Sequence, residues 1–523
     1  MITGSLKNKV NAIWQDFYNE NMAQTSDIVN QLTTLMFIKM LDDKQSAVEA
    51  QAAVIGVNPS QNDLIFKDGI YRNVEVYIDS EGDERKRINF EIPYENIRWK
   101  NFKNLNSMDL AKTIKNYVIP FIKDPNNSSI GQFGKYAKKY IFGFDDKERL
   151  LTSVVDKLSD PEFDFTNIDL MGDVYEYMCG SGISGQFRTP RHIIEMAVKM
   201  MKPKLGEAII DPAMGTAGFI IEASRYIRHS QKTELLNVKN NKKFNDEMFF
   251  GADNDPNMAR IGYMNAILHG IKNPIFTMDS LLENESAKEY IGKFDLVLAN
   301  PPFSGSLVET ATNGKILSIT KTKKTELLFV ALMVMLLKVG GRCMTIVPDG
   351  VLFGTGTAHK KLRIELIEKQ KLIGVVSLPS GIFSAPAKKG SASKGSEVKT
   401  SFVIFQKTNN GGTDNVWFYD MKNDGFSFGS KRTPIEENDI PDIITRFNNL
   451  ENEKLNSRTQ QSFLVPVDEI RENDYELTFN KYKKTEKTVT NHRNVNFIIE
   501  DLKNIQNDII KDMEHLEKIL GTK

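Results

Sequence analysis

The stretch Phe294-Asp-Leu-Val-Leu-Ala-Asn-Pro-Pro-Phe303 decides the fold, because it joins a short apolar run directly to a rigid polar turn. An apolar run of this length is typical of a parallel strand that is buried on both faces of a sheet. Proline fixes its own φ and pushes the residue before it towards extended conformations, so Asn300 and Pro301 are both constrained. We therefore predict a buried strand over 294–299 that presents Asn300 in a fixed direction.

Four further runs rich in Ile, Val and Phe resemble this one, and they lie at 208–210, 248–252, 342–347 and 372–378. Helical stretches alternate with them, and the runs end at Gly, Asp, Asn or Pro. Such alternation predicts a doubly wound α/β domain, which we place at 166–407. Residues 401–406 are expected to add another strand.

A mostly helical N-terminal domain is predicted for residues 1–165, because its apolar residues recur at intervals of three and four. Between Asp63 and Pro93 the pattern changes to the alternation typical of strands, as at Val74 and Val76. We expect one hairpin there, with a charged, solvated tip.

The C-terminal region, 408–523, is polar and irregular in pattern until Val495, where a last helix is predicted. The apolar residues of that helix form one stripe: Ile499, Leu502, Ile509, Met513, Leu516 and Leu520. A helix with one apolar stripe must bury it. Docking on its own domain and bundling with a partner subunit explain the stripe equally well.

The composition is that of an ordinary soluble protein, with 523 residues of which 40% are hydrophobic. It excludes disordered, collagen-like and disulfide-scaffold classes. Two cysteines and six histidines without zinc-site spacing predict no metal, and a reducing cytoplasm is the expected location. The N-terminus lacks the apolar core of a signal peptide, and the longest apolar run, 327–337, is shorter than the roughly 20 residues that cross a bilayer. We therefore expect no membrane span.

A glycine-containing turn, Asp211-Pro-Ala-Met-Gly-Thr-Ala-Gly-Phe219, follows the first predicted strand and opens a helix. Gly215 and Gly218 let the backbone approach a ligand closely. The spacing is GxxG and not the GxGxxG of dinucleotide-binding folds. The acid Asp211 suits a cationic ligand, such as a sulfonium with an amino group, better than a phosphate. A purely structural turn would show the same pattern.

Two further acids follow predicted strands. Asp253 ends the second strand, where a carboxylate can accept hydrogen bonds from both hydroxyls of a ribose. Asp279 ends another short strand, where it could accept from an adenine amino group. Each acid could equally be a solvated loop residue.

The turn after 294–299 can hold an amino group. The Asn300 side-chain oxygen and the Pro301 carbonyl can both accept from one amine, while Phe303 offers a flat face on which a base can stack. The lone pair of an exocyclic amine is delocalised into its ring, and two acceptors favour a pyramidal nitrogen that can attack a methyl sulfonium. This chemistry needs neither a metal nor a general base. The alternative is a strand-terminating turn with a core Phe, which a buried strand in a glycine-turn α/β domain disfavours.

Four motifs in this order, GQFRTP at 185–190, DPAMGTAGF, GAD and NPPF, resemble the γ-class amino-methyltransferases. Together with the helical N-terminal domain and the phrase IPYENIRWKNFKNL, the chain resembles the methylation (M) subunits of type I restriction-modification systems. The resemblance covers nearly the whole chain, including VVSLPSGIF after the fifth strand. It implies site-specific N6 methylation of a flipped adenine in DNA, with S-adenosylmethionine as the methyl donor.

The same resemblance assigns roles to individual residues. It implies that the catalytic set, which holds the adenine, is Asn300, Pro301, Pro302 and Phe303. The implied cofactor set comprises the closing loop, the glycine turn and the acids, namely Gln186, Phe187, Arg188, Thr189, Pro190, Arg191, Asp211, Gly215, Thr216, Ala217, Gly218, Asp253 and Asp279. Three positions depart from the family pattern: Arg188 replaces an aromatic residue, Met214 a small one and Asp253 a Glu.

Double-stranded DNA and two kinds of subunit are the implied partners: one specificity subunit shared by two methylation subunits, and a restriction subunit that joins them. Four lysines in 384–399 are candidates for contacts with the DNA backbone: Lys388, Lys389, Lys394 and Lys399. A solvated lysine loop is the alternative. The balance of 68 Lys and Arg against 68 Asp and Glu predicts that the chain alone binds DNA weakly.

Two rival functions remain at this point. Methylation of cytosine N4, of RNA or of a protein glutamine would use the same motif, although the length and the helical N-terminal domain disfavour small protein-modifying enzymes. A non-catalytic scaffold is the other rival, and the intact NPPF and GxxG motifs disfavour it.

Overall fold

The computed structural model describes residues 4–22, 24–61, 64–80, 82–127, 130, 133–138, 140–164, 174, 177, 189–278, 280–283, 287–303, 305–307, 312–383, 398–427, 432–484 and 495–521. The chain divides into two compact units, Met1–Tyr482 and Lys483–Lys523. The boundary expected between residues 165 and 166 lies outside the described residues.

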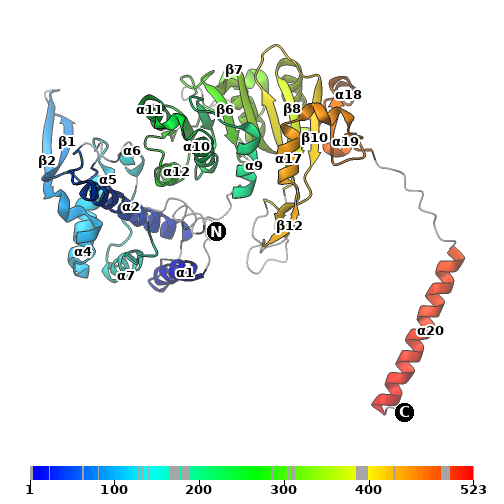
Figure 1. Cartoon of the computed structure of the whole chain (residues 1–523), viewed down its shortest axis with the longest axis horizontal. Coiled ribbons are helices and arrows are strands. Elements are labelled where there is room, and N and C mark those ends of the chain that lie inside the picture. Colours follow the sequence, from blue (N-terminus) through cyan, green and yellow to red (C-terminus); the bar gives the residue numbers. More distant parts are fainter. Residues whose placement is uncertain are drawn as a thin grey trace. The chain divides into compact units, whose positions relative to one another are not determined.

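The N-terminal part is helical with one hairpin, as predicted (Figure 1). The antiparallel hairpin consists of β1 (Ile70–Ile78) and β2 (Glu84–Pro93). The helices around it are α1 (Gly4–Asn19), α2 (Thr25–Ile55), α3 (Trp99–Phe102), α4 (Ser107–Thr113), α5 (Ile119–Lys123), α6 (Phe133–Ala137) and α7 (Glu148–Leu158). Short turns of other helix types lie at η1 (Tyr94–Ile97) and η2 (Ile114–Val118). Aromatic residues such as Phe17, Phe37 and Phe133 fill the core between these helices.

A nine-stranded mixed sheet forms the centre of the first unit, in the order β13-β10-β8-β9-β7-β6-β3-β4-β5. Its strands are β3 (Ile209–Asp211), β4 (Phe249–Ala252), β5 (Ile275–Thr277), β6 (Phe294–Ala299), β7 (Leu337–Pro348), β8 (Lys371–Ser377), β9 (Thr400–Gln406), β10 (Asn415–Asp420) and β13 (Ser462–Pro466). All five predicted strands and the additional one near 401–406 are confirmed. Strand β9 runs antiparallel between β7 and β8, and β13 runs antiparallel to β10.

Helices cover both faces of this sheet. One face carries α9 (Arg191–Met201), α10 (Gly218–Ser230), α12 (Pro256–Leu268) and α17 (Ile440–Phe447). The other carries α14 (Thr325–Leu336), α16 (Thr357–Ile364), α18 (Val467–Glu472) and α19 (Phe479–Tyr482). The smaller elements are η4 (Glu234–Leu236), α11 (Val238–Asp246), α13 (Gly314–Ile319), α15 (Gly350–Phe353), η5 (Glu365–Lys369), β11 (Asp424–Phe426), β12 (Pro434–Asn438) and η6 (Leu450–Leu455). The doubly wound α/β architecture is thus confirmed.

The region after residue 407 differs from the expected irregular chain. Strands β10 and β13 extend the sheet, and the buried residues Trp417 and Phe463 anchor them in the two cores. The apolar core of β10 is short and lies among polar residues, which is why the pattern did not reveal it. The sheet therefore continues beyond the expected domain end.

The N-terminal helices pack on α12 (Figure 1). Tyr136 stacks on Tyr263 with ring centroids 4.7 Å apart, and its hydroxyl donates to the Phe276 carbonyl at the end of the sheet. Arg260 of α12 donates to the Asn30 side chain over 2.7 Å. One helix of the sheet domain therefore carries much of this contact.

The apolar run 327–337 forms the buried helix α14 and the first residue of β7. Among the described residues no helix is long and apolar enough to cross a membrane. The second unit contains α20 (Val495–Leu520), the predicted last helix, and side chains of its stripe such as Leu502 and Leu516 are more than half exposed.

Candidate active site

The predicted catalytic turn lies at the carboxyl end of β6, in the middle of the sheet. Leu296 and Leu298 enter the core on one face of the sheet, while Val297 and Ala299 enter the core on the other. The strand is therefore buried on both faces, as predicted, and it fixes the position of Asn300.

The amide of Asn300 has one occupied and one open end. Its Nδ2 donates to the hydroxyl of Thr189 over 2.9 Å. Its Oδ1 is buried and accepts no hydrogen bond from the described part of the chain. A buried oxygen without a donor is costly, because it has lost its water and gained no partner. The open acceptor is therefore a place where a ligand amine can bind.

Thr189 reaches Asn300 from 111 residues away in the chain. The resemblance assigned Thr189 to the loop over the cofactor, and in the structure its hydroxyl lies against the side-chain amide of Asn300. Pro190 precedes α9, and Arg191 opens that helix and lies 3.4 Å from Glu195 in an ion pair. Thr189, near the end of the GQFRTP motif, therefore contacts Asn300, the first residue of NPPF.

Phe303 packs against a second aromatic ring. The ring of Phe383 meets it edge-on, with centroids 5.5 Å apart and planes at 88°. Pro301 is buried and Pro302 is exposed. Sequence reasoning noted VVSLPSGIF but gave Phe383 no role, because nothing in that phrase shows which strand end it adjoins.

The glycine turn between β3 and α10 is tightly wound, and two residues in it have left-handed backbones. Gly215 has φ +49° and Ala217 has φ +62°. A Cβ on Gly215 would meet no atom of the described residues within 4 Å, so these residues leave the space over the turn open. The turn thus offers a ligand free backbone surface.

Helix α12 supports that turn from behind. A Cβ on Gly262 would lie 2.8 Å from the Gly215 carbonyl oxygen, so any larger residue there would force the helix or the turn to shift. The Asn265 side chain donates to the Thr216 carbonyl over 2.8 Å. Neither residue was predicted, because a contact across the fold leaves no local pattern.

Asp253 ties the second strand to the glycine turn. Its Oδ2 accepts from the Gly215 amide over 3.0 Å, and its Oδ1 accepts from the Asp255 amide over 2.9 Å. Burial raises the pKa of this carboxyl, and the two amides oppose the shift. Each carboxylate oxygen retains a second lone pair with which to accept from a ribose hydroxyl.

The side chain of Asp211 is buried, which changes the charge that was expected there. Burial raises its pKa to about 8, an effect that the Ala213 amide opposes and nearby Asp253 reinforces. The carboxyl is therefore mostly protonated at pH 7 in this state, and a cation bound beside it would favour ionisation. The sequence pattern showed the acid but not its burial.

Several predicted residues lie outside the described part of the chain: Gln186, Phe187, Arg188, Asp279, Lys388, Lys389 and Lys394. Of the four candidate lysines only Lys399 is described, and its Nζ lies 4.0 Å from Asp349. Within the described residues no group of three His, Cys, Asp or Glu lies together as metal ligands would.

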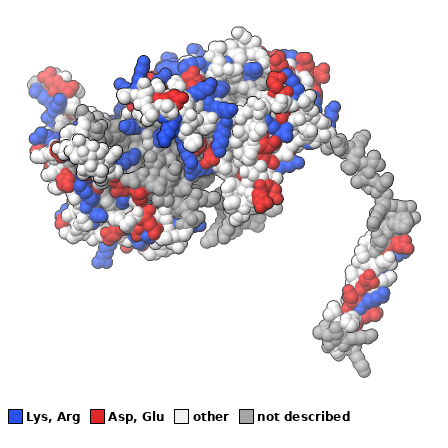
Figure 2. Space-filling view, in the orientation of Figure 1, with Lys and Arg blue, Asp and Glu red and all other residues white. Residues whose placement is uncertain are grey.

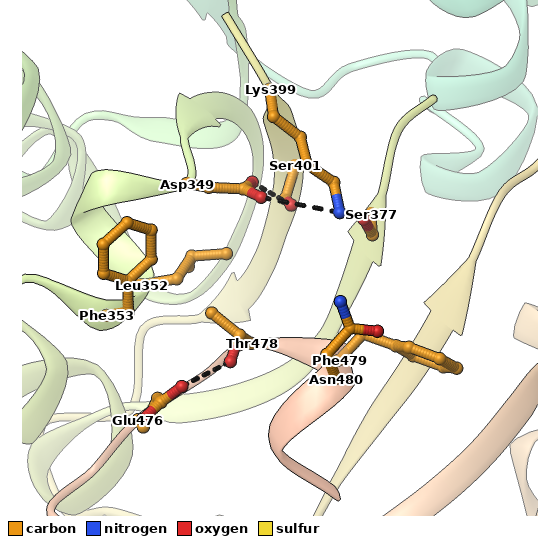
Figure 3. A pocket seen from close by; sticks show the side chains of 10 residues that line it. All are labelled: Asp349, Leu352, Phe353, Ser377, Lys399, Ser401, Glu476, Thr478, Phe479 and Asn480. Carbon is orange, nitrogen blue, oxygen red and sulfur yellow. Dashed lines mark hydrogen bonds and ion pairs between the residues drawn. The ribbon is translucent and has the colours of Figure 1, made fainter. Parts of the chain in front are cut away.

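A polar cavity of about 380 Å³ opens at the carboxyl ends of β7 and β8 (Figure 3). Asp349 accepts from the Ser401 hydroxyl over 2.7 Å at one side, and Glu476 and Asn480 come from the segment after α18 on the other. Among the described residues, none of those predicted to bind the cofactor or the base lines it, so the cavity is distinct from the Asn300 turn.

Acidic and basic side chains are interspersed over most of the face in Figure 2, while Lys and Arg are more frequent over α10 and α11. Helix α11 contributes the exposed Lys239 and Lys242. The equal totals of acidic and basic residues are therefore compatible with a local enrichment of Lys and Arg over α10 and α11 on this face.

A methyltransferase-type sheet with this turn defines the class, and comparison with known proteins defines the family. Residues 166–491 match the N-6 DNA Methylase family and residues 6–158 match the HsdM N-terminal domain. The chain belongs to the N-6 DNA Methylase family. It is an adenine-specific DNA methyltransferase, the methylation subunit of a type I restriction-modification system.

Relatives agree with this membership. The type I restriction enzyme EcoEI methylase subunit of Escherichia coli is 29% identical over 71% of this chain and 72% of its own length. A solved chain described for complex assembly of the type I R-M system has TM-score 0.64 and 24% identity, covering 100% of both chains. The type I methyltransferase subunit from Streptococcus thermophilus has TM-score 0.62 and 19% identity, covering 91% of this chain and 100% of its own. The two structures show that the fold is shared.

Proposed function

We propose that the Asn300 turn holds the N6 amine of an adenine rotated out of the duplex while a methyl group is transferred to it. The buried, unpartnered Oδ1 of Asn300 carries this proposal, because an adenine amine would supply the missing donor. The Pro301 carbonyl is the second acceptor, and Phe303 stacks on the base with Phe383 behind it.

The two acceptors activate the amine. They draw its hydrogens out of the ring plane, so that the nitrogen lone pair becomes available for in-line attack. After transfer the nitrogen carries one proton too many, which leaves to solvent. Asn300 holds the hydrogens and takes up no proton itself, because an amide is a very weak base.

S-Adenosylmethionine fits the glycine turn and supplies the methyl group from a positively charged sulfonium. The open space over Gly215 accommodates it, and Thr216, Ala217 and Gly218 form the turn along which its methionine part would lie. Asp253 would accept from the ribose, and Asp211 would ionise next to the bound cation. Gln186, Phe187, Arg188, Pro190, Arg191 and Asp279 are proposed to complete this site.

We further propose that two copies of the chain join one specificity subunit, with a restriction subunit added for cleavage. The exposed stripe of α20 supports docking, since residues such as Leu502 and Ile509 need an apolar partner. The specificity subunit would then supply base readout and much of the hold on double-stranded DNA. We place the assembly with its DNA in the cytoplasm.

Nucleoside mass analysis tests the reaction. The chain, reconstituted with its specificity subunit, is incubated with unmethylated plasmid and S-adenosylmethionine, and the DNA is digested to nucleosides. We expect N6-methyladenine. N4-methylcytosine, or no methylated nucleoside from an intact assembly, would contradict the proposal.

A further inference from the structure

The hydrogen bond between Thr189 and Asn300 joins two residues that each precede a proline. Proline restricts the backbone of the residue before it, so both partners have little freedom. Thr189 is only 7% exposed. We infer that Thr189 is a positioning residue that sets which end of the Asn300 amide faces the base, an inference that rests on the proposed function.

The orientation of this amide decides whether the base can bind. An asparagine amide presents an acceptor at one end and two donors at the other, and rotation about its last torsion exchanges them. The adenine amine offers only donors on the side that it would present. With Oδ1 towards the base the pair is complementary, whereas the reversed amide opposes donors to donors. The hydrogen bond from Asn300 Nδ2 to the Thr189 hydroxyl favours the arrangement with Oδ1 towards the base over the reversed one by up to about tenfold.

The threonine is held in place from two sides. The Pro190 carbonyl accepts from the amides of Ile193 and Ile194, which starts α9 two residues after Thr189. A ring nitrogen of His192 lies 2.9 Å from the buried Asp424 carboxylate. These contacts fix the first turn of α9 and with it the preceding Thr189, so the Thr189 hydroxyl stays in reach of Asn300.

The same helix also abuts the cofactor turn. A Cβ on Gly218 would lie 2.9 Å from Cδ1 of Ile194, so α9 and the start of α10 touch without spare room. Helix α9 therefore contacts the start of α10 through Ile194, while Thr189, two residues before the helix, contacts Asn300. The Thr189–Asn300 hydrogen bond thereby fixes the Asn300 Oδ1 acceptor relative to the direction in which the adenine amine attacks the methyl group.

This role differs in a measurable way from a contact with the cofactor. Loss of a cofactor contact weakens binding of S-adenosylmethionine. Loss of the Thr189–Asn300 hydrogen bond leaves cofactor binding intact and lowers the rate of methyl transfer, because fewer bound bases meet the Asn300 Oδ1 acceptor. The separation of kcat from the dissociation constant of S-adenosylmethionine therefore distinguishes the two roles.

The experiment compares Thr189→Val, which keeps the shape and removes the hydroxyl, with Thr189→Ser, which keeps the hydroxyl. Both are assayed in the complex with the specificity subunit by single-turnover methylation, with melting temperature and cofactor affinity measured alongside. We expect Thr189→Val to lower the rate by about 2- to 10-fold, because loss of a tenfold preference halves the share of correctly oriented amides and a reversed preference lowers it further. Its cofactor affinity should stay within about twofold of the unaltered complex, and Thr189→Ser should recover most of the rate.

Three results would overturn the inference: a rate for Thr189→Val equal to that of the unaltered complex, a matching loss of cofactor affinity, or no recovery in Thr189→Ser. If the valine variant does not assemble, Thr189→Ala and Thr189→Ser provide the same comparison, because both lack the methyl group and differ by the hydroxyl. Failure of the unaltered complex to form N6-methyladenine would instead remove the proposed function.

Discussion

Substitution of Gly262 by alanine should weaken binding of S-adenosylmethionine through a contact behind the cofactor turn. The added Cβ would lie 2.8 Å from the Gly215 carbonyl oxygen, whereas ordinary contacts begin at 3.4 Å. Helix α12 or the turn must therefore move by about 0.6 Å. Overpacking of this kind costs about 1–3 kcal/mol.

The stability of the protein should change little by comparison. Replacing a glycine inside a helix by alanine gains about 1 kcal/mol of helix propensity, which offsets part of the strain. The remaining strain distorts the glycine turn rather than the helix, because Arg260 and Tyr263 hold α12 against the N-terminal helices. A loss of about 1.4 kcal/mol in binding corresponds to a tenfold weaker affinity, so we expect a dissociation constant raised by about 10-fold or more.

Isothermal titration of the complex with S-adenosylmethionine measures this effect. Gly314→Ala is the matched control, because Gly314 also lies in a helix and a Cβ there would meet no atom within 4 Å. The control should bind the cofactor normally. An unchanged affinity in Gly262→Ala, with melting temperature also unchanged, would refute the idea that α12 shapes the cofactor turn.

Three further outcomes are expected. The Asp211 carboxyl keeps its proton in the folded chain up to a pKa of about 8 but loses it near 4 when the chain is unfolded, so the stability of the chain falls as pH rises from 4 to 8. Asp211→Asn removes this fall, so urea unfolding should show the variant gaining several kcal/mol of stability relative to the unaltered chain between pH 5 and pH 8.5. A stability difference between the two proteins that is the same at both pH values would contradict this expectation. Phe383→Ala should cost about 3–5 kcal/mol of stability, because the side chain is buried. It should also lower kcat at saturating cofactor, because Phe303 loses its edge-on contact, and an equal kcat in a folded variant would contradict that role. The double variant Leu502→Lys, Ile509→Lys places two charges on the exposed apolar stripe of α20, so it should abolish co-purification with the specificity subunit while the chain alone keeps its melting temperature. Undiminished co-purification would show that this stripe docks elsewhere.

Local patterns predicted much of this fold because they carry its strongest signals. The run 294–299 was recognisable as a buried strand since nearly every residue in it is apolar, and the prolines after it marked the turn. The glycine turn could be placed for the same reason. The direction of β9 and the contribution of β10 could not, because strand pairing depends on partners far away in the chain.

The site shows the same division. Asn300 was found from its motif, whereas its contact with Thr189 and the ring contact of Phe383 join segments that no local spacing relates. The burial of Asp211, which raises the pKa of its carboxyl, could not be predicted because burial is a property of the fold and not of the turn sequence. Long-range packing therefore accounts for what the sequence pattern could not supply.

The most direct test of the account replaces Asn300 and measures methylation by the assembled complex. Asn300→Ala removes the acceptor and should abolish transfer of labelled methyl groups to plasmid DNA, with assembly and cofactor affinity retained. Asn300→Asp, which keeps acceptor oxygens at the same place, should retain more activity than the alanine variant. Methylation by Asn300→Ala at a rate near that of the unaltered complex would contradict the central claim.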